Sequence, residues 1–460
     1  MWIIKVLIFI SLFFLPVKAQ TGDILRNIID SQIMDILKGS DISADDIGIY
    51  VKSLTSGEVI YNKNGDKLFI PASNQKIITT ASALLTLGPD FRFETRFLTD
   101  GSIKAGVLKG NLYILGGYNP ELNENYYTEF VKFLKDRGVS KIEGNVIAIS
   151  NVNYQPQGWP ENDLNYCFTV SPSDIPISEN CLRVKVVVDR GVKVFLSPAG
   201  YIEIVNQLSM SKGKNHIDAK LEGQKLYISG NVRNRKSEEF SLPIKNPALY
   251  NLLVFTKILH QNGINFNKVY ISNSLPSNLN PVYSIKSSPL RDIIKKANKD
   301  SNNFIAEQLF LYLGKSNIIK SMEKMRVSVS YTDIFDGSGL SKYNKVSPKV
   351  LGEILDFMYK TPYFEDFFQS LAVGGKDGTL KHRFSDLAGK VYAKTGYIKG
   401  VKNLSGYAIS VDGQVYIFSI LVNNLKSTKP ANEIQERVCK VLVNSTNLSK
   451  SADSKVKIFH

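Results

Sequence analysis

Three short polar motifs, far apart in the chain, constrain the fold of this sequence more than any other feature. Ser73–Lys76 opens a stretch with apolar residues at helical spacing that ends at Gly88. Ser301–Asn303 stands directly before a second such stretch, and Lys394–Gly396 ends a strand-like one. Each motif is common by chance when taken alone. Their order, at two helix starts and one strand, predicts a single site drawn from distant parts of the chain.

Ser73 stands where backbone groups would favour a nucleophile. The start of a helix has free N–H groups and the positive end of the helix dipole, which stabilise negative charge on an attacking oxygen. Lys76 lies three residues later, so it shares a helix face with Ser73 and can reach its hydroxyl. A buried lysine near other cations has a lowered pKa and can accept the serine proton. The alternative is a helix cap followed by a surface lysine.

The other two motifs supply groups that can bind a substrate. Ser301 and Asn303 offer a hydroxyl and a carboxamide, although both residue types also favour helix caps. Lys394 and Thr395 can hold a carboxylate, and Gly396 lets a substrate approach the strand edge closely. In this order the three motifs are the signature of penicillin-binding proteins and class A β-lactamases.

The chain resembles the D-alanyl-D-alanine carboxypeptidase/endopeptidase family of class C low-molecular-mass penicillin-binding proteins, peptidase family S13. The resemblance covers most of the mature chain. Beyond the three motifs it rests on further stretches, namely Ser287–Leu290, Ala306–Leu309, Asp336–Ser341, Asp377–Leu380, Arg383-Phe384, Leu404–Tyr407 and Phe418-Ser419. The interval between Lys76 and Ser301 is far too long for the compact β-lactamase arrangement and is similar to the large insertion of this family.

This resemblance implies an α+β fold. A serine transpeptidase/β-lactamase-like domain, an antiparallel sheet flanked by helices, would be interrupted by a large β-rich insertion. The sequence agrees, because short β-rich runs separated by Gly, Asn and Pro replace the helical periodicity over 97–273. We therefore expect a catalytic domain formed by 20–96 and 274–447. The insertion would form one or two domains, and a basic flexible tail would follow at 448–460.

The resemblance also implies the chemistry, which is acyl transfer at a D-alanyl-D-alanine terminus. Lys76 would deprotonate Ser73, which attacks the carbonyl of the penultimate D-alanine and expels the terminal D-alanine. Water would then release the acyl-enzyme. Ser301 would relay a proton to the leaving amine, and Asn303 would bind the substrate amide. Cleavage of peptide cross-links is a second activity that the resemblance implies.

The same resemblance assigns the remaining site groups. Lys394 and Thr395 would hold the terminal carboxylate, and Gly396 would also belong to the substrate-binding residues. Backbone N–H groups of Ser73 and Tyr397 would form the oxyanion hole. The family often has Ser or Thr where this chain has Tyr397, so we expect the bulky ring to alter the fit of substrates or β-lactams. No metal or other cofactor is expected.

The expected partners are peptidoglycan stem peptides, with β-lactams as covalent inhibitors. Residues 1–19 have the charge, the apolar run and the small residues of a signal peptide, so we expect export to the periplasm or cell wall. An uncleaved anchor is the alternative. No later apolar stretch is long enough for a stable membrane span. Lys and Arg exceed Asp and Glu, 57 to 42, but they are scattered, so we expect no nucleic-acid partner.

Two other classes of function stay open at this point. A catalytically weak peptidoglycan-binding scaffold would keep the fold, although the presence of every catalytic side chain argues against it. A β-lactamase or esterase would release its acyl group quickly. The histidines lack partners at a spacing diagnostic of a Ser-His-Asp triad. The cysteines match no zinc site, and the spacing of Cys167 and Cys181 permits a disulfide without establishing it.

A fluorescent penicillin should label the mature protein covalently at Ser73, because Ser73 and Lys76 share a helix start and Lys394–Gly396 follows on a strand. The Ser73→Ala variant should show no labelling, measured by gel fluorescence and by mass spectrometry of the labelled peptide. Undiminished labelling of this variant would show that the nucleophile lies elsewhere.

Overall fold

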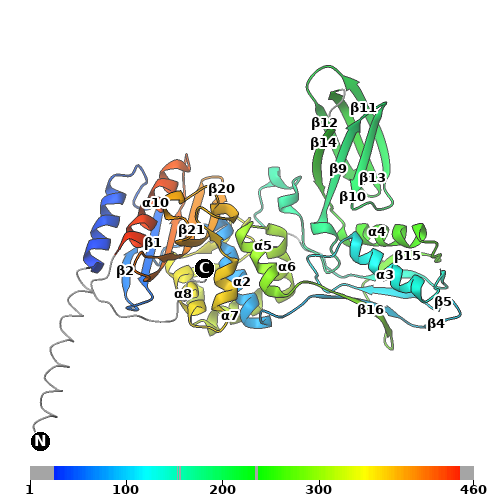
Figure 1. Cartoon of the computed structure of the whole chain (residues 1–460), viewed down its shortest axis with the longest axis horizontal. Helices are drawn as coiled ribbons and strands as arrows, with labels where there is room; N and C mark the ends of the chain where they lie inside the picture. Colours follow the sequence, from blue (N-terminus) through cyan, green and yellow to red (C-terminus); the bar gives the residue numbers. More distant parts are fainter. Residues whose placement is uncertain (1–24, 153, 155–156, 234–236, 446–460) are drawn as a thin grey trace, which may run out of the picture. The chain divides into compact units, whose positions relative to one another are not determined.

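The computed structural model describes the chain apart from a few segments. The segments outside the description are 1–24, 153, 155–156, 234–236 and 446–460, which include the expected signal peptide, 1–19, and basic tail, 448–460. The chain divides into two compact units (Figure 1). Of the described residues, the first contains those within 25–89, 291–302 and 313–445, and the second contains those within 90–290 and 303–312. No helix among the described residues is long and apolar enough to span a bilayer.

An antiparallel sheet forms the centre of the first unit (Figure 1). Its strands are, in spatial order, β19 (Ala372–Val373), β20 (Val391–Ile398), β21 (Val401–Ile409), β22 (Val415–Val422), β1 (Ile47–Ser53) and β2 (Val59–Lys63). Every neighbouring pair is antiparallel. All residues of β22 are buried, because helices cover both faces of the sheet at this strand.

Helices pack on both faces of this sheet. The helix over 25–38 and α10 (Lys429–Asn444) share a hydrophobic core with one face. On the other face lies α8 (Pro348–Tyr359), where the Tyr407 hydroxyl donates a hydrogen bond to the Leu355 carbonyl oxygen. The remaining helices and strands here are α2 (Gln75–Leu87), α5 (Leu290–Lys299), α7 (Lys315–Lys324), α9 (Phe364–Ser370), β17 (Thr332–Asp333) and β18 (Lys345–Val346).

The helix that follows Ser73 begins and ends where the sequence predicts. A 3-10 turn, Ala72–Asn74, runs directly into α2, and Gly88 ends the helix with a φ of 78°. The α2 side chains are buried as far as Leu84. The polar Lys76 is therefore carried into the interior together with its apolar neighbours.

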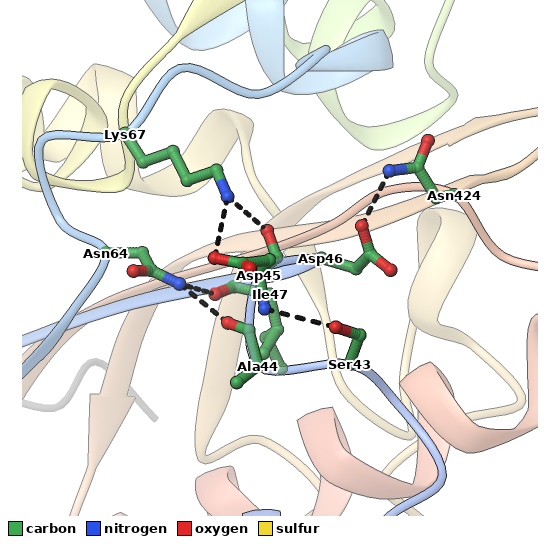
Figure 2. A network of polar contacts seen from close by, with 8 residues as sticks. All are labelled: Ser43, Ala44, Asp45, Asp46, Ile47, Asn64, Lys67 and Asn424. Carbon is green, nitrogen blue, oxygen red and sulfur yellow. Dashed lines mark hydrogen bonds and ion pairs between the residues drawn. The ribbon is translucent and has the colours of Figure 1, made fainter.

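The start of β1 is tied to two neighbouring segments by side-chain hydrogen bonds (Figure 2). Asn64 donates from Nδ2 to the carbonyl oxygens of Ala44 and Ile47, at 2.8 Å each. Asn424, just after β22, donates to the Asp46 carboxylate at 2.6 Å. Because these contacts hold the ends of β1, β2 and β22 together, they support the register of the central strands.

The second unit is built on a mixed sheet with helices packed against it. The strands, in spatial order, are β15 (Val269–Ser272), β8 (Val146–Ile149), β6 (Leu112–Leu115), β3 (Glu94–Thr99) and β16 (Asn280–Lys286). The helices that share a core with this sheet are α3 (Glu124–Asp136) and α4 (Pro247–Gln261), and the unit also contains most of α6 (Asn303–Leu313). Smaller sheets combine β9 (Cys181–Val188) with β10 (Val192–Ser197) and β14 (Ser237–Pro243), β11 (Glu203–Ser211) with β12 (His216–Glu222) and β13 (Lys225–Arg233), and β4 (Ser102–Lys104) with β5 (Val107–Lys109) and β7 (Lys141–Ile142).

Strand pairing places the boundary between the units outside the expected insertion, 97–273. The strands β3 and β16 pair antiparallel along Glu94–Thr99 and Asn280–Lys286. The strand β3 begins before residue 97, and β16 lies entirely after residue 273. The second unit accordingly begins after Pro89, and the chain returns to the first unit after Leu290. The local β-rich texture could not reveal this pairing, because the two strands are far apart in the sequence.

A disulfide joins Cys167 and Cys181 in the second unit, at a sequence separation of 14. The fold brings their Cα atoms to 5.6 Å, which is within the usual range for a disulfide. Cys439 is a free thiol buried in α10. Burial raises the pKa of the Cys439 thiol, so it stays protonated and unreactive.

Removing the disulfide should lower the stability of the second unit by about 3 kcal/mol, because the cross-link restricts a loop of this length in the unfolded chain. The Cys167→Ser/Cys181→Ser variant should unfold at a lower urea concentration, followed by the fluorescence of Trp159, which is buried in this unit. The control is Cys439→Ala, which should leave this transition unchanged. An unshifted midpoint in the double variant would show that the loop is held without the cross-link.

Candidate active site

The first unit brings Ser73, Lys76, Ser301 and Lys394 into two hydrogen-bonded pairs. Lys76 Nζ lies 3.0 Å from Ser73 Oγ, and Lys394 Nζ lies 2.9 Å from Ser301 Oγ. Both lysine side chains are completely buried. The start of α2, the turn before α6 and the strand β20 therefore each contribute a polar group to these two pairs.

The two buried amines influence each other. Burial lowers the pKa of Lys394 well below its ordinary value, and the charge of Lys76 lowers it further. Because this repulsion is mutual, charge on one amine disfavours charge on the other. The arrangement favours a state in which at least one amine is neutral. A neutral lysine amine beside a serine hydroxyl can act as a general base.

Two residues in or next to these pairs have a positive φ, a backbone conformation that residues other than glycine rarely adopt. Ala72, directly before Ser73, has a φ of 45°, and Ser301 has a φ of 57°. Each such conformation costs a residue with a side chain about 1 kcal/mol or more. Both residues stand where the chain enters a helix that carries a predicted site residue. Alanine and serine are not typical of this conformation, so no residue type in the sequence indicates it.

The loop Asp336–Ser341 lies against Lys76. The Ser338 carbonyl oxygen accepts a hydrogen bond from Lys76 Nζ at 2.7 Å. Gly339 has a φ of 87°, and a Cβ there would stand 1.8 Å from the Ala72 carbonyl oxygen. The loop therefore contacts both the lysine and the turn that carries the serine, which its place in the family resemblance alone did not reveal.

Thr379 lies beside a predicted site residue, although its place in the sequence suggests no role for it. Its Oγ1 lies 2.9 Å from the Oγ1 of Thr395. The turn that carries Thr379, Gly378–Leu380, follows Asp377, whose carboxylate accepts a hydrogen bond from the Val373 N–H at 2.8 Å. The signal that could have found Thr379 is its position inside the Asp377–Leu380 stretch that contributes to the family resemblance.

The strand β20 has an unpaired edge beside these hydroxyls. Its neighbour β19 pairs only with Tyr392 and Ala393, so no described strand covers this edge along Lys394–Ile398. An extended peptide can form main-chain hydrogen bonds with such an edge. The sequence suggests that Gly396 admits a substrate, but a Cβ there would stand 2.7 Å from the Pro71 carbonyl oxygen. Gly396 thus lets β20 approach the turn before α2.

Two other predicted site residues make contacts of a different kind. Asn303 begins α6 and belongs to the second unit, where its Nδ2 donates to the Phe168 carbonyl oxygen at 2.9 Å. Ser301 belongs to the first unit, so the motif crosses from one unit to the other. Tyr397 is 62% exposed, and its ring centroid lies 5.4 Å from the Lys402 ammonium on β21. Within the described ranges, no cluster of His, Cys, Asp and Glu could hold a metal ion.

Known proteins are similar to this chain in sequence and in fold. The model of the D-Ala-D-Ala carboxypeptidase 3 (S13) family matches residues 29–444. The D-alanyl-D-alanine carboxypeptidase DacB of Haemophilus influenzae is 27% identical over 82% of this chain and 85% of its own length. The D-alanyl-D-alanine carboxypeptidase of Actinomadura sp. is 25% identical over 88% of this chain and 82% of its own.

Solved structures give the same result for the fold. The crystal structure of penicillin binding protein 4 (dacB) from Haemophilus influenzae matches with a TM-score of 0.77 and 26% identity, covering 89% of this chain and 99% of that one. Its complex with a novel beta-lactam matches with a TM-score of 0.74. These matches confirm the predicted α+β fold class.

Gly339→Ala should destabilise the protein more than Gly413→Ala, although both glycines have a φ of 87°. An added Cβ at Gly413 meets nothing within 4 Å. The loss of stability there should therefore come only from the left-handed backbone conformation and amount to about 1 kcal/mol. At Gly339 the clash with Ala72 should add about 1–3 kcal/mol. Thermal unfolding measures both effects, and only Gly339→Ala should also slow acylation by penicillin. Equal effects of the two substitutions would contradict the close approach of this loop to α2.

Proposed function

Because the chain belongs to the D-Ala-D-Ala carboxypeptidase 3 (S13) family, we propose that it removes the terminal D-alanine from peptidoglycan stem peptides through an acyl-enzyme at Ser73. The observation that supports this most directly is the 3.0 Å contact between Ser73 Oγ and the completely buried amine of Lys76. The curated relatives from Haemophilus influenzae and Actinomadura are named for this activity.

Acylation begins with proton transfer from Ser73 to the neutral amine of Lys76. The serine oxygen attacks the carbonyl carbon of the penultimate D-alanine, and the bond from this carbon to the nitrogen of the terminal D-alanine breaks. The leaving nitrogen takes up one proton, which passes from Lys76 through the Ser301 hydroxyl. Support for this relay comes from the Lys394 amine, which lies 2.9 Å from Ser301 Oγ and holds the hydroxyl in place.

The substrate binds along the unpaired edge of β20. The Thr395 hydroxyl and the Lys394 amine hold the terminal carboxylate by hydrogen bonds. The backbone N–H groups of Ser73 and Tyr397 stabilise the oxyanion. The carboxamide of Asn303 binds the substrate amide, as the family motif implies.

Deacylation returns the enzyme to its starting state. Water attacks the acyl carbon, Lys76 accepts its proton, and this proton returns to Ser73 Oγ as the ester bond breaks. Cleavage of a cross-link is the same reaction with a larger leaving group, the amine of a second stem peptide. The family resemblance supports this second activity. β-Lactams acylate Ser73 in the same way, and the solved complex of the Haemophilus influenzae relative with a beta-lactam supports the binding of such compounds.

A peptidoglycan substrate requires the enzyme to act outside the cytoplasm. We therefore propose that the protein is exported through residues 1–19 and works in the periplasm or cell wall. Mass spectrometry of the N-terminal peptide of the protein extracted from the cell envelope tests this proposal. The expected result is a chain that starts near residue 20.

The reaction products of purified muropeptides distinguish the candidate functions. The mature protein is incubated with monomeric and cross-linked muropeptides, with and without penicillin, and the products are identified by mass spectrometry. Penicillin-sensitive loss of D-alanine supports the carboxypeptidase, and conversion of dimers to monomers adds the endopeptidase. Binding without any product would indicate a scaffold, and rapid penicillin hydrolysis would indicate a β-lactamase; either result would contradict the proposal.

Lys76→Ala should lower the acylation rate on the order of 10²–10⁴-fold, because it removes the base. Lys394→Ala, tested with a substrate that lacks a carboxylate, should have a much smaller effect, because it leaves the contact between Lys76 and Ser73 in place. Stopped-flow measurement of acylation compares the two variants in one assay. Acylation of Lys76→Ala at nearly the wild-type rate would mean that another group is the base.

A further inference from the structure

The loop Asp336–Ser341 contacts α2 through successive backbone groups. The Gly337 carbonyl oxygen accepts a hydrogen bond from Thr79 Oγ1 at 2.7 Å. The Ser338 carbonyl oxygen accepts one from Lys76 Nζ, also at 2.7 Å. The next residue is the glycine that approaches the turn before Ser73. The positions of these backbone groups therefore bear directly on the serine and lysine pair.

One buried carboxylate holds this loop in shape. The Asp336 side chain is completely buried, and its Oδ1 accepts hydrogen bonds from the Gly339 N–H at 2.8 Å and from Asn344 Nδ2 at 2.6 Å. Its Oδ2 accepts one from the Ser341 N–H at 2.6 Å. Asn344 in turn accepts a hydrogen bond from the Phe335 N–H at 2.8 Å. Hydrogen bonds to a buried carboxylate are strong, so the loop backbone is fixed on both sides of Ser338.

The Ser338 carbonyl constrains how Lys76 can act. A carbonyl oxygen can only accept hydrogen bonds, so it faces an N–H of Lys76 whether the amine is charged or neutral. The neutral amine has one lone pair, and it must point toward Ser73 Oγ to take the proton. A carbonyl fixed at 2.7 Å on another side of Nζ limits the rotation of the amine and keeps the lone pair available to the serine.

We propose that Asp336 is a positioning residue for acyl transfer. Its carboxylate fixes the loop whose Ser338 carbonyl orients the Lys76 amine toward Ser73. Asp336 acts through the loop backbone and contributes no proton. This inference rests on the proposed function, since it takes Lys76 as the base.

Asp336→Asn tests the proposal with little change in shape. The carboxamide keeps one acceptor oxygen, but its NH₂ group faces a backbone N–H that then lacks an acceptor. Release of D-alanine from a short D-Ala-D-Ala peptide should fall on the order of 10²-fold in kcat, while KM should change by no more than about twofold, because the lysine is misplaced and the substrate contacts are kept. Acylation by penicillin should slow by the same factor. Asn344→Ala removes one donor to Asp336 and should show a smaller fall of the same kind.

The matched control is Asp356→Asn in the same unit. Asp356 lies on α8 and accepts hydrogen bonds from Lys52 and Lys360, at 2.8 Å each. This variant also removes a hydrogen-bonded carboxylate from the first unit, but it leaves the loop Asp336–Ser341 intact. We expect it to lower thermal stability and to keep kcat within about twofold of the wild type.

The outcomes separate this proposal from the proposed function. Two results for folded Asp336→Asn would overturn the positioning role. In the first, its kcat equals that of the control Asp356→Asn. In the second, its KM rises while its kcat stays at the wild-type value. If Asp336→Asn does not fold, Asn344→Ala decides by the same criteria. Wild-type protein that neither reacts with penicillin at Ser73 nor releases D-alanine would refute the proposed function itself. If the wild-type protein releases D-alanine and the loop variants Asp336→Asn and Asn344→Ala keep its kcat, only the positioning role is refuted.

Discussion

Two lysine amines buried close to each other are the constraint on which the rest of this site depends. Removing a charged amine from water is unfavourable unless polar groups surround it. Lys76 and Lys394 each meet a serine hydroxyl and a backbone carbonyl oxygen, which replace part of the lost solvent. The burial that makes charge unfavourable lowers the pKa of Lys394, and repulsion couples the two amines. These conditions favour a state in which one of the two amines is uncharged.

The fold supplies these surroundings from segments that are distant in the sequence. The apolar residues of α2 carry Lys76 into the interior, and β20 carries Lys394 beside the turn that contains Ser301. The loop Asp336–Ser341 brings a carbonyl oxygen to Lys76. The polar groups therefore lie within hydrogen-bond distance of one another in this structure, which is the kind of arrangement that preorganised sites use.

The chain passes repeatedly between the two units, so residues of the predicted site that are close in the sequence belong to different units. It leaves the first unit after Pro89, returns after Leu290, and crosses again for 303–312. Ser301 and Asn303 are neighbours in the sequence, yet each packs within a different unit. In the second unit, the Cys167–Cys181 disulfide stands next to Phe168, whose carbonyl oxygen accepts the hydrogen bond of Asn303. The cross-linked segment therefore supports a residue of the predicted site.

The sequence alone determined the family and the fold class and predicted the residues of the site, because these depend on local patterns. Ser73 and Lys76 are three residues apart at a helix start, and that spacing puts them on one face wherever the helix packs. Tertiary structure alone decided the hydrogen bond from Lys76 to Ser338, the contact of Thr379 with Thr395, the disulfide and the strand pairing that bounds the second unit. These contacts join groups that are distant in the sequence, and some use backbone atoms that every residue has, so no local pattern encodes them.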